Sequence, residues 1–566
     1  MTTARRPGRG RGSRRWMVAA LVVVAAAGSG SWALLGPRPT VGRSTILAGL
    51  RVVQVGHLVV LAVAVAGAVV LGGRVALGRR RGVRRPGSAR ALLACGSTLV
   101  ALAGLEGAAV LWRGVAHRVA VAATVAAPPA GRLAADDLYL VVLGESSALG
   151  APYAPCTSVG QIAEWQLRRV FPWRRVRVDV LAENALTLEG ALRKFADLPR
   201  RPDAVVLYSG HNEVASRYPL DRAVPHYLDE ASPFDRLAWR AREASPLARL
   251  IQEVVDAQKT TDPPPPELRH LVDVPALTAV ESARLLADFR GRLEAFAVAC
   301  ERLGALPIFV IPPGNDAGFE PNRSVLAPAT PKADRDALAR RFEAARGSEK
   351  GDPARAVAGY RAIVAEHPSF AEAHFRLARL LARSGAVAEA NRHYEAARDG
   401  DALPIRCPTP YHDAYRAVAA RHRCLLIDGP AVFRRASARG IVDDGLFHDA
   451  QHPNLIGYVA LARDLLDQLR ARKAFGWPGE APPPAFDAAS CAARFGLGPE
   501  QWAIVCVHSM MFYHGALPLR YDPAERWAAN LRYGQAARAI GMRVPPEKLG
   551  IVGVGTPEAA GRENPM

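Results

Sequence analysis

Three uncharged apolar stretches near the N-terminus set the strongest limit on how this chain folds. Trp16–Gly36 and Val52–Gly73 contain no charged residue, and Ala91–Trp112 contains only Glu106. Each stretch is long enough for a helix that crosses a hydrocarbon core about 30 Å thick. Three such stretches in succession are hard to bury inside one soluble domain. We therefore expect residues 1–118 to form a membrane anchor with three transmembrane helices.

The position of the positive charge supports this anchor. The formal net charge is +20, and residues 1–118 hold +17 of it, as eighteen arginines against one acid. Six arginines precede the first stretch, three follow it, seven follow the second and three follow the third, the last of which (Arg132) lies beyond residue 118. This alternation predicts a cytoplasmic N-terminus and a C-terminal body outside the cytoplasm. A cleaved signal peptide is the alternative for the first stretch. The bilayer is thus an expected partner, and nucleic acid is not.

Beyond a linker at residues 119–133, the pattern changes to that of an α/β domain spanning residues 134–475. Five short apolar runs alternate with longer helical patterns, at Leu138–Leu143, Val176–Leu181, Ala204–Tyr208, Pro307–Ile311 and Cys424–Ile427. Apolar strands separated by helices are typical of a parallel sheet covered on both faces. Ligands of such sheets bind at the carboxyl ends of the strands. The residues that follow these runs are therefore the candidates for chemistry.

Two insertions and an extension accompany this domain. Residues 215–300 have a helical pattern, and residues 333–400 contain a repeat. An alanine and a tyrosine recur with a period of 34 residues, first as Ala356 and Tyr360 and then as Ala390 and Tyr394. This period resembles a tetratricopeptide (TPR) helical hairpin, which would offer a surface to a protein partner. An ordinary helical hairpin is the alternative. The sequence indicates no role for the extension 476–566.

Metal and cofactor motifs are absent from the sequence. There is no C-x-x-C, no phosphate-binding G-x-x-x-x-G-K-[ST] and no H-E-x-x-H, so we expect neither a cofactor nor a metal. Six cysteines lie beyond residue 118. In an oxidising compartment they permit disulfides, with Cys491 and Cys506 as the easiest local pair.

Polar blocks follow the first, third and fifth apolar runs. They read Gly144-Glu145-Ser146, Gly210-His211-Asn212-Glu213 and Asp449-Ala450-Gln451-His452-Pro453. A serine hydroxyl attacks an ester only when a base removes its proton. Ser146 is the candidate nucleophile and His452 the candidate base, with Asp449 orienting the imidazole. Among the 14 histidines, His452 alone has an aspartate three residues before it.

The same blocks supply donors for the oxyanion that forms during acyl transfer. The backbone N–H of Ser146 and the side-chain amide of Asn212 are the natural pair. Two neighbours, Ser147 and His448, are alternative participants in the chemistry. The surrounding G-E-S-S-A is not the G-x-S-x-G of α/β-hydrolases, so we do not expect that fold.

Taken together, the three blocks resemble the SGNH (GDSL-type) hydrolase family, whose blocks read G-D-S, G-x-N-D and D-x-x-H-P. The resemblance covers residues 137–213, 304–325 and 424–470, and extends to a membrane-anchored bacterial subgroup. It implies a flavodoxin-like, three-layer fold with a parallel five-stranded sheet. Glu145 and Glu213 stand where the family has aspartates.

The resemblance also implies a third oxyanion donor, the N–H of a glycine after the second strand. No glycine follows Asn184 closely, so the backbone N–H of Ala185 or Leu186 would have to serve instead.

The first hypothesis is a serine esterase in the bacterial cytoplasmic (inner) membrane, with its catalytic domain in the extracytoplasmic or periplasmic space. It would hydrolyse an O-acyl, O-acetyl or lipid-type ester at the cell envelope through an acyl-enzyme. The second is an O-acyltransferase that acts on an envelope polysaccharide. The third is a scaffold without catalysis that holds envelope partners.

Overall fold

A computed structural model describes residues 60, 69–71, 93–111, 137–215, 229, 233–257, 277–479, 482–520 and 522–540. The expected spans Trp16–Gly36 and Val52–Gly73 lie outside the described residues, apart from four positions in the second. Two compact units divide the chain. One comprises Met1–Ala116 with Ala231–Thr260, and the other His117–Glu230 with Thr261–Met566.

Two helices in the described part of the chain are long and apolar enough to cross a membrane. The first, Leu93–Leu111, coincides with the third expected span, and the second is Pro499–Leu519 in the C-terminal extension. Length and apolarity are shared by membrane helices and by buried helices of soluble domains. Three N-terminal spans were expected. In the described residues, only the helix Leu93–Leu111 lies where the sequence predicted a span.

The first unit holds the helix Leu93–Leu111 together with α8 (Pro233–Ala244) and α9 (Pro246–Ala257). Glu106 accepts a hydrogen bond from the Ser245 hydroxyl and, at 2.9 Å, another from the Leu247 N–H. Its carboxylate therefore meets the N-terminal turn of α9, where backbone N–H groups lack partners within the helix. The expected insertion 215–300 is thus shared between the units, because α10 (Ala279–Leu303) belongs to the second.

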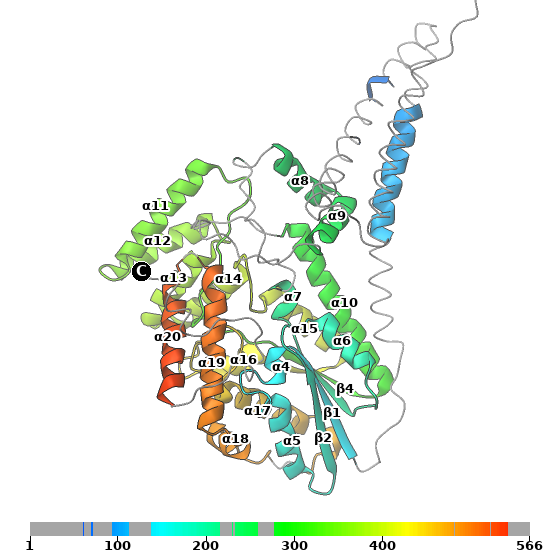
Figure 1. Ribbon diagram of the computed structural model, residues 1–566, viewed down its shortest axis with the longest axis vertical. Coiled ribbons are helices and arrows are strands. Elements are labelled where there is room, and N and C mark those ends of the chain that lie inside the picture. The colour runs from blue at the N-terminus through cyan, green and yellow to red at the C-terminus, as the bar shows by residue number, and fades with distance from the viewer. Residues whose placement is uncertain are drawn as a thin grey trace, which may run out of the picture. The chain divides into compact units, whose positions relative to one another are not determined.

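A five-stranded parallel sheet forms the centre of the second unit, as the sequence predicted (Figure 1). The strand order is β2-β1-β3-β4-β5, for β1 (Asp137–Gly144), β2 (Arg175–Ala182), β3 (Ala204–Tyr208), β4 (Leu306–Ile311) and β5 (Leu425–Asp428). All four strand pairs are parallel. The carboxyl ends of β1, β3 and β5 therefore meet at one edge of the sheet.

Alternation along β1 shows how the sheet is covered on both faces. Leu138, Leu140 and Val142 join one buried cluster, whereas Tyr139, Val141 and Leu143 join another. Successive side chains of a strand point to opposite faces, so each cluster lies on its own side. The helices that contribute to the first cluster include α5 (Val159–Val170), α17 (Leu455–Ala471) and α18 (Ala488–Arg494). Those that contribute to the second include α6 (Leu188–Ala196), α10 and α15 (Thr409–His422).

Four helices form the second insertion, namely α11 (Lys332–Ser348), α12 (Pro353–Glu366), α13 (Ala371–Arg383) and α14 (Val387–Asp399). The repeated residues Ala356, Tyr360, Ala390 and Tyr394 are all buried in one cluster between these helices. A shift of 34 residues places the residues of α12 on those of α14. The repeat therefore corresponds to two helices that bury an alanine and a tyrosine at equivalent positions. The resemblance to a TPR unit stays a prediction.

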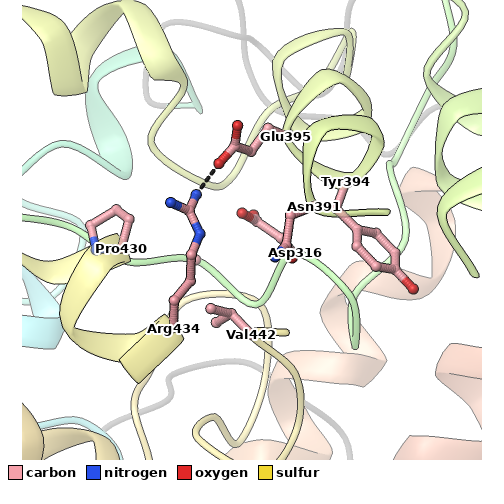
Figure 2. Close-up of a pocket in the computed structure, with 8 residues that line it drawn as sticks. Asp316, Asn391, Tyr394, Glu395, Pro430, Arg434 and Val442 are labelled. Atoms are coloured by element: carbon pink, nitrogen blue, oxygen red, sulfur yellow. Dashed lines mark hydrogen bonds and ion pairs between the residues drawn. The ribbon is translucent and has the colours of Figure 1, made fainter. Parts of the chain in front are cut away.

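This insertion packs against the sheet domain (Figure 2). A small pocket lies between α14 and α16 (Gly429–Ala436), where Arg434 forms an ion pair with Glu395. Nearby, Arg398 of α14 pairs with Asp316 at 2.7 Å. Both partners are largely buried, so the insertion is fixed to the loop that follows β4.

The extension 476–566 is part of the same unit. Trp477, Phe486 and Cys491 lie in the buried cluster beside α5 and α17. After α18 the chain forms α19 (Pro499–Ala516), the short helix η2 (Leu517–Leu519) and α20 (Ala524–Ala539). We call α19 and α20 the C-terminal hairpin. All seven cysteines are free thiols, so the expected local pair of Cys491 with Cys506 does not form.

Candidate active site

The candidate nucleophile lies in a tight turn at the end of β1. Gly144 has φ +151°, and a Cβ there would lie 1.9 Å from the Tyr208 carbonyl oxygen, so only glycine fits. Ser146 follows as the first residue of the short helix α4 (Ser146–Leu149). The first N–H groups of a helix have no acceptor within it. The backbone N–H of Ser146 is therefore suited to bind a substrate oxygen.

The structure brings Ser146, His452 and Asp449 together in one chain of hydrogen bonds. Ser146 Oγ lies 2.8 Å from His452 Nε2, and His452 Nδ1 lies 2.8 Å from Asp449 Oδ2. The three residues are 6%, 4% and 0% exposed, respectively. In this order the carboxylate orients the imidazole, and the imidazole can take the serine proton.

The loop that carries the histidine and the aspartate is closed on itself. Phe447 and Pro453 form an antiparallel bridge, and the His448 N–H donates to the His452 carbonyl at 3.0 Å. Within the loop, Asp449 Oδ1 accepts the N–H groups of Gln451 and His452, each at 2.9 Å. The loop geometry thus fixes the carboxylate under the imidazole.

The electrostatics of Asp449 follow from these bonds. Burial alone would raise its pKa, but the charge and hydrogen bond of His452 outweigh burial, with help from the two backbone N–H groups. The net effect is a lowered pKa, so the carboxylate stays ionised at neutral pH. An ionised carboxylate is what stabilises an imidazolium during acyl transfer.

Glu145 joins the nucleophile block to the block after β3. Its two carboxylate oxygens accept the N–H groups of His211 at 3.0 Å and Asn212 at 3.2 Å. The pKa of Glu145 is raised to about 8, mainly because the side chain is fully buried. Nearby Glu213 adds to the rise, and the N–H donors offset part of it. The glutamate therefore has a positioning role, and Glu213 has a similar one because it accepts the Leu188 N–H.

Asn212 begins the short helix α7 (Asn212–Ala215), beside the turn that carries the nucleophile. Its Nδ2 donates to the Leu186 carbonyl at 3.1 Å. A side-chain amide has two N–H groups, so one is left to meet a substrate oxygen. This arrangement fits the expected oxyanion role of Asn212.

The loop after β2 also has a feature that the sequence could not reveal. Ala185 has φ +58°, a left-handed conformation that L-residues other than Asn and Asp seldom adopt. The chain therefore takes at Ala185 a backbone conformation that glycine adopts without strain. Leu186 N–H donates to the Glu183 carbonyl at 3.5 Å. Of the two expected candidates, Ala185 is therefore the better third donor.

Two alternative participants have other partners. Ser147 Oγ donates to the Gln451 carbonyl at 3.0 Å, and His448 Nε2 lies 2.5 Å from the Tyr153 hydroxyl. Ser147 is buried and His448 is partly buried, and neither joins the hydrogen-bonded chain of Ser146.

The C-terminal hairpin contributes side chains that sequence reasoning missed. His508 and Phe512 of α19 meet the His452 ring edge-on, with ring centroids 5.5 Å and 5.6 Å away. From α20, the Tyr533 hydroxyl donates to the His448 carbonyl at 2.8 Å. No motif predicts these contacts, because the apolar residues of α19 are spread around the helix and mark no single face.

One group of side chains has the spacing of metal ligands. Asp449, His452 and His508 offer an oxygen and two nitrogens that lie within 4.8 Å of one another. The Asp449 carboxylate already accepts hydrogen bonds from His452 and from two backbone N–H groups, and His452 is bonded to Ser146. An ion bound there would have to replace those bonds.

Comparisons with known proteins leave the family open. No family model matches the chain, and no curated protein matches it. Among solved structures, it is similar to LAE5, described as an alpha/beta hydrolase enzyme from the metagenome of Lake Arreo, Spain. That match has 15% identity and a TM-score of 0.27, and covers 60% of this chain and 97% of LAE5. TesA matches at 15% identity and a TM-score of 0.23, covering 59% of this chain and 98% of TesA. Neither score assigns a family.

Proposed function

We propose that this chain is a membrane-anchored serine esterase of SGNH type that hydrolyses an O-acyl, O-acetyl or lipid-type ester outside the cytoplasm. The observation that carries the proposal is the 2.8 Å contact between Ser146 Oγ and His452 Nε2, with Asp449 on the far nitrogen. The apolar helix Leu93–Leu111 and the arginine-rich residues 1–118 support the membrane anchor. The bacterial cytoplasmic membrane is the proposed location.

The reaction proceeds in two halves. Ser146 Oγ attacks the ester carbonyl carbon while His452 takes the serine proton, and the carbonyl oxygen becomes an oxyanion. The N–H groups of Ser146 and Ala185 and the amide of Asn212 receive that charge. His452 then gives its proton to the leaving alcohol, which departs and leaves an acyl-enzyme. Water, deprotonated by His452, releases the acid and restores Ser146.

A second candidate function, transfer of the acyl group to a carbohydrate hydroxyl, has one observation in its favour. The chain of hydrogen bonds through Ser146, His452 and Asp449 can deprotonate a carbohydrate hydroxyl as well as water, so it serves either acceptor. The acceptor hydroxyl would take the place of water in the second half, with His452 as the same base. A polysaccharide of the cell envelope is the proposed acceptor.

The experiment uses the full-length chain in detergent, treated with a fluorophosphonate and assayed with p-nitrophenyl acetate. Labelling and turnover are expected in the native chain and in Ser147→Ala, and neither in Ser146→Ala. Labelling that persists in Ser146→Ala would refute the assigned nucleophile. A native chain that is inert in both assays would favour the third reading, a scaffold that holds partners on helices α11 to α14.

Two additions complete the assay. Soluble oligosaccharides added to the reaction separate hydrolysis from transfer, because a transferase would move the acyl group to them at the expense of free acid. A reporter fused to the C-terminus, active only in the cytoplasm, tests the orientation. Reporter activity would overturn the proposed extracytoplasmic placement.

A further inference from the structure

Helix α19 lies beside His452, and this position indicates which part of an ester substrate it would contact. In acyl transfer, the histidine hands its proton to the oxygen of the departing alcohol. Side chains packed around that imidazole therefore lie beside the alcohol part of an ester, and the oxyanion donors lie beside the acyl carbonyl. His508 and Phe512 are such side chains, with both rings edge-on to His452.

His508 carries an unused hydrogen-bonding atom at this position. Its Nδ1 is buried and has no hydrogen-bond partner among the described residues. One of its ring nitrogens lies within 4.8 Å of both a His452 nitrogen and an Asp449 oxygen. A buried polar atom without a partner is costly, so a hydrogen bond from a bound group at this position would be favourable.

The protonation state of His508 fits a hydroxyl as that bound group. Burial, together with the nearby His452, lowers the pKa of His508 to about 4, although Asp449 raises it in part. At neutral pH the ring is therefore uncharged, with one nitrogen as a donor and the other as an acceptor. A hydroxyl can satisfy either kind of nitrogen, whereas a carboxylate or phosphate would prefer a cation.

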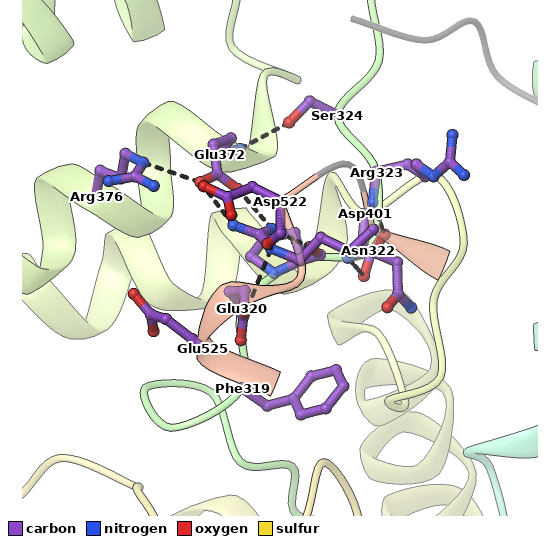
Figure 3. A network of polar contacts seen from close by, with 12 residues as sticks. Phe319, Glu320, Asn322, Arg323, Ser324, Glu372, Arg376, Asp401, Asp522 and Glu525 are labelled. Atoms are coloured by element: carbon purple, nitrogen blue, oxygen red, sulfur yellow. Dashed lines mark hydrogen bonds and ion pairs between the residues drawn. The ribbon is translucent and has the colours of Figure 1, made fainter. Parts of the chain in front are cut away.

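Buried ion pairs and hydrogen bonds hold α19 in place at its C-terminal end (Figure 3). Arg520 donates to both carboxylate oxygens of Glu372 on α13, at 2.8 Å and 2.9 Å. Arg323 donates to the Leu519 carbonyl at 2.7 Å. Arg526 donates to the Ala516 and Glu320 carbonyls, each at 2.8 Å.

These bonds involve the last residues of α19 and of η2, and the loop after β4. A helix fixed in this way presents its side chains in one geometry, which is a requirement for a specific subsite. His508 and Phe512 therefore have a defined position relative to His452.

We propose that His508 and Phe512 form the leaving-group subsite, and that the alcohol part of the natural ester carries a further hydroxyl, as in a polyol or a sugar. This inference rests on the proposed esterase function and narrows its substrate class. Phe512 supplies an apolar surface for the carbon skeleton, and His508 supplies the hydrogen bond to the hydroxyl.

The test compares two esters that differ in hydroxyl groups. Glycerol monoacetate and n-propyl acetate share a three-carbon alcohol skeleton, and glycerol adds two hydroxyls. The full-length chain in detergent is expected to prefer glycerol monoacetate in kcat/KM. In His508→Phe the ratio of the two kcat/KM values should fall by about tenfold, as expected for one lost hydrogen bond to substrate.

Two further variants sharpen the result. His508→Asn places an amide near the position of Nδ1 and should restore part of the preference. His514→Phe changes a histidine in the last turn of the same helix and should leave the ratio unchanged. Circular dichroism of each variant checks that the fold is kept.

The outcomes distinguish failure of the proposed subsite from failure of the proposed esterase activity. If the native chain hydrolyses both esters without preference, or if His508→Phe lowers both kcat/KM values equally, the subsite is refuted and the esterase stands. If the native chain hydrolyses neither ester and a fluorophosphonate does not label Ser146, both the esterase and the subsite are refuted.

Discussion

Replacing Glu145 by glutamine tests whether a buried carboxyl group beneath the nucleophile controls stability between mildly acidic and mildly basic pH. In the folded chain its pKa is about 8, against 4.5 for an ordinary glutamate, mainly because of burial. Between these two values, the folded state holds a proton that the unfolded state has released. The free energy of unfolding therefore falls as pH rises through this window.

The size of the effect follows from the two pKa values. At 1.36 kcal/mol for each unit of pKa difference, ionising Glu145 in the folded state costs about 5 kcal/mol in total. The stabilisation is fully present below pH 4.5 and is lost as pH rises through about 8. Other buried carboxyls also change stability with pH, some with a raised pKa (Asp316, Asp401) and some with a lowered one (Asp449, Glu372). The informative quantity is therefore the difference between the native chain and Glu145→Gln.

The assay is denaturant unfolding of both chains in detergent, at intervals between pH 5 and pH 9. The native chain should lose stability with a limiting slope of about 1.4 kcal/mol per pH unit relative to Glu145→Gln. Parallel curves for the two chains would refute the reasoning, because they would mean that Glu145 has the same pKa in the folded and unfolded states.

Three more substitutions have defined outcomes. Asp449→Asn should lower kcat for p-nitrophenyl acetate by about 10³–10⁴-fold, since the imidazole loses its orienting carboxylate; an unchanged kcat would exclude the assigned role. Ala185→Gly should raise the free energy of unfolding by up to about 1 kcal/mol, because φ +58° is unstrained for glycine; urea titration measures it, and a loss of stability would contradict it. Glu372→Gln should lower that free energy by up to about 3–5 kcal/mol, because Arg376 loses a carboxylate partner and buried Arg520 keeps only Glu320. Burial alone would raise the pKa of Glu372, but its arginine partners outweigh burial and lower the pKa to about 2. In the native chain, the stabilisation by ionised Glu372 is therefore fully present above pH 4.5 and is lost as pH falls towards 2. The matched control Glu366→Gln removes an exposed pair with Arg341 and should change stability much less.

The sheet and the catalytic blocks could be predicted because both depend on local patterns. Each strand is a continuous apolar run, and each block directly follows one of the strands β1 and β3 or lies on a short loop. Parallel strands align their carboxyl ends, so Ser146 and Asn212 had to share one edge of the sheet. Asp449 and His452 were predicted as a pair because only two residues lie between them, and the structure places both in one closed loop.

The contribution of the C-terminal hairpin could not be predicted for a physical reason. The ring contact between His452 and His508 joins segments far apart in sequence, and such contacts leave no periodic signal. An apolar face would normally reveal which side of a helix is covered, but the apolar residues of α19 are spread around the helix. Its length and apolarity suggest a membrane helix equally well.

The loop after β2 was uncertain for a different reason. A glycine would have indicated a left-handed backbone, and here Ala185 adopts that conformation without the usual signature. The division of residues 215–300 was also hidden, because the contact of Glu106 with the start of α9 depends on tertiary structure. The sequence shows that Glu106 lies in the third apolar stretch, but not that it contacts Ser245 and Leu247.

The routes by which the insertions leave the sheet have an evolutionary consequence. Both insertions depart from the carboxyl ends of strands, after β3 and after β4, and the hairpin reaches the same edge from the end of the chain. Related chains could therefore exchange, lengthen or lose these segments without moving Ser146 or His452. Diversification would then change which molecules are admitted and how they are held, while the bond-breaking groups and the strands beneath them are inherited intact.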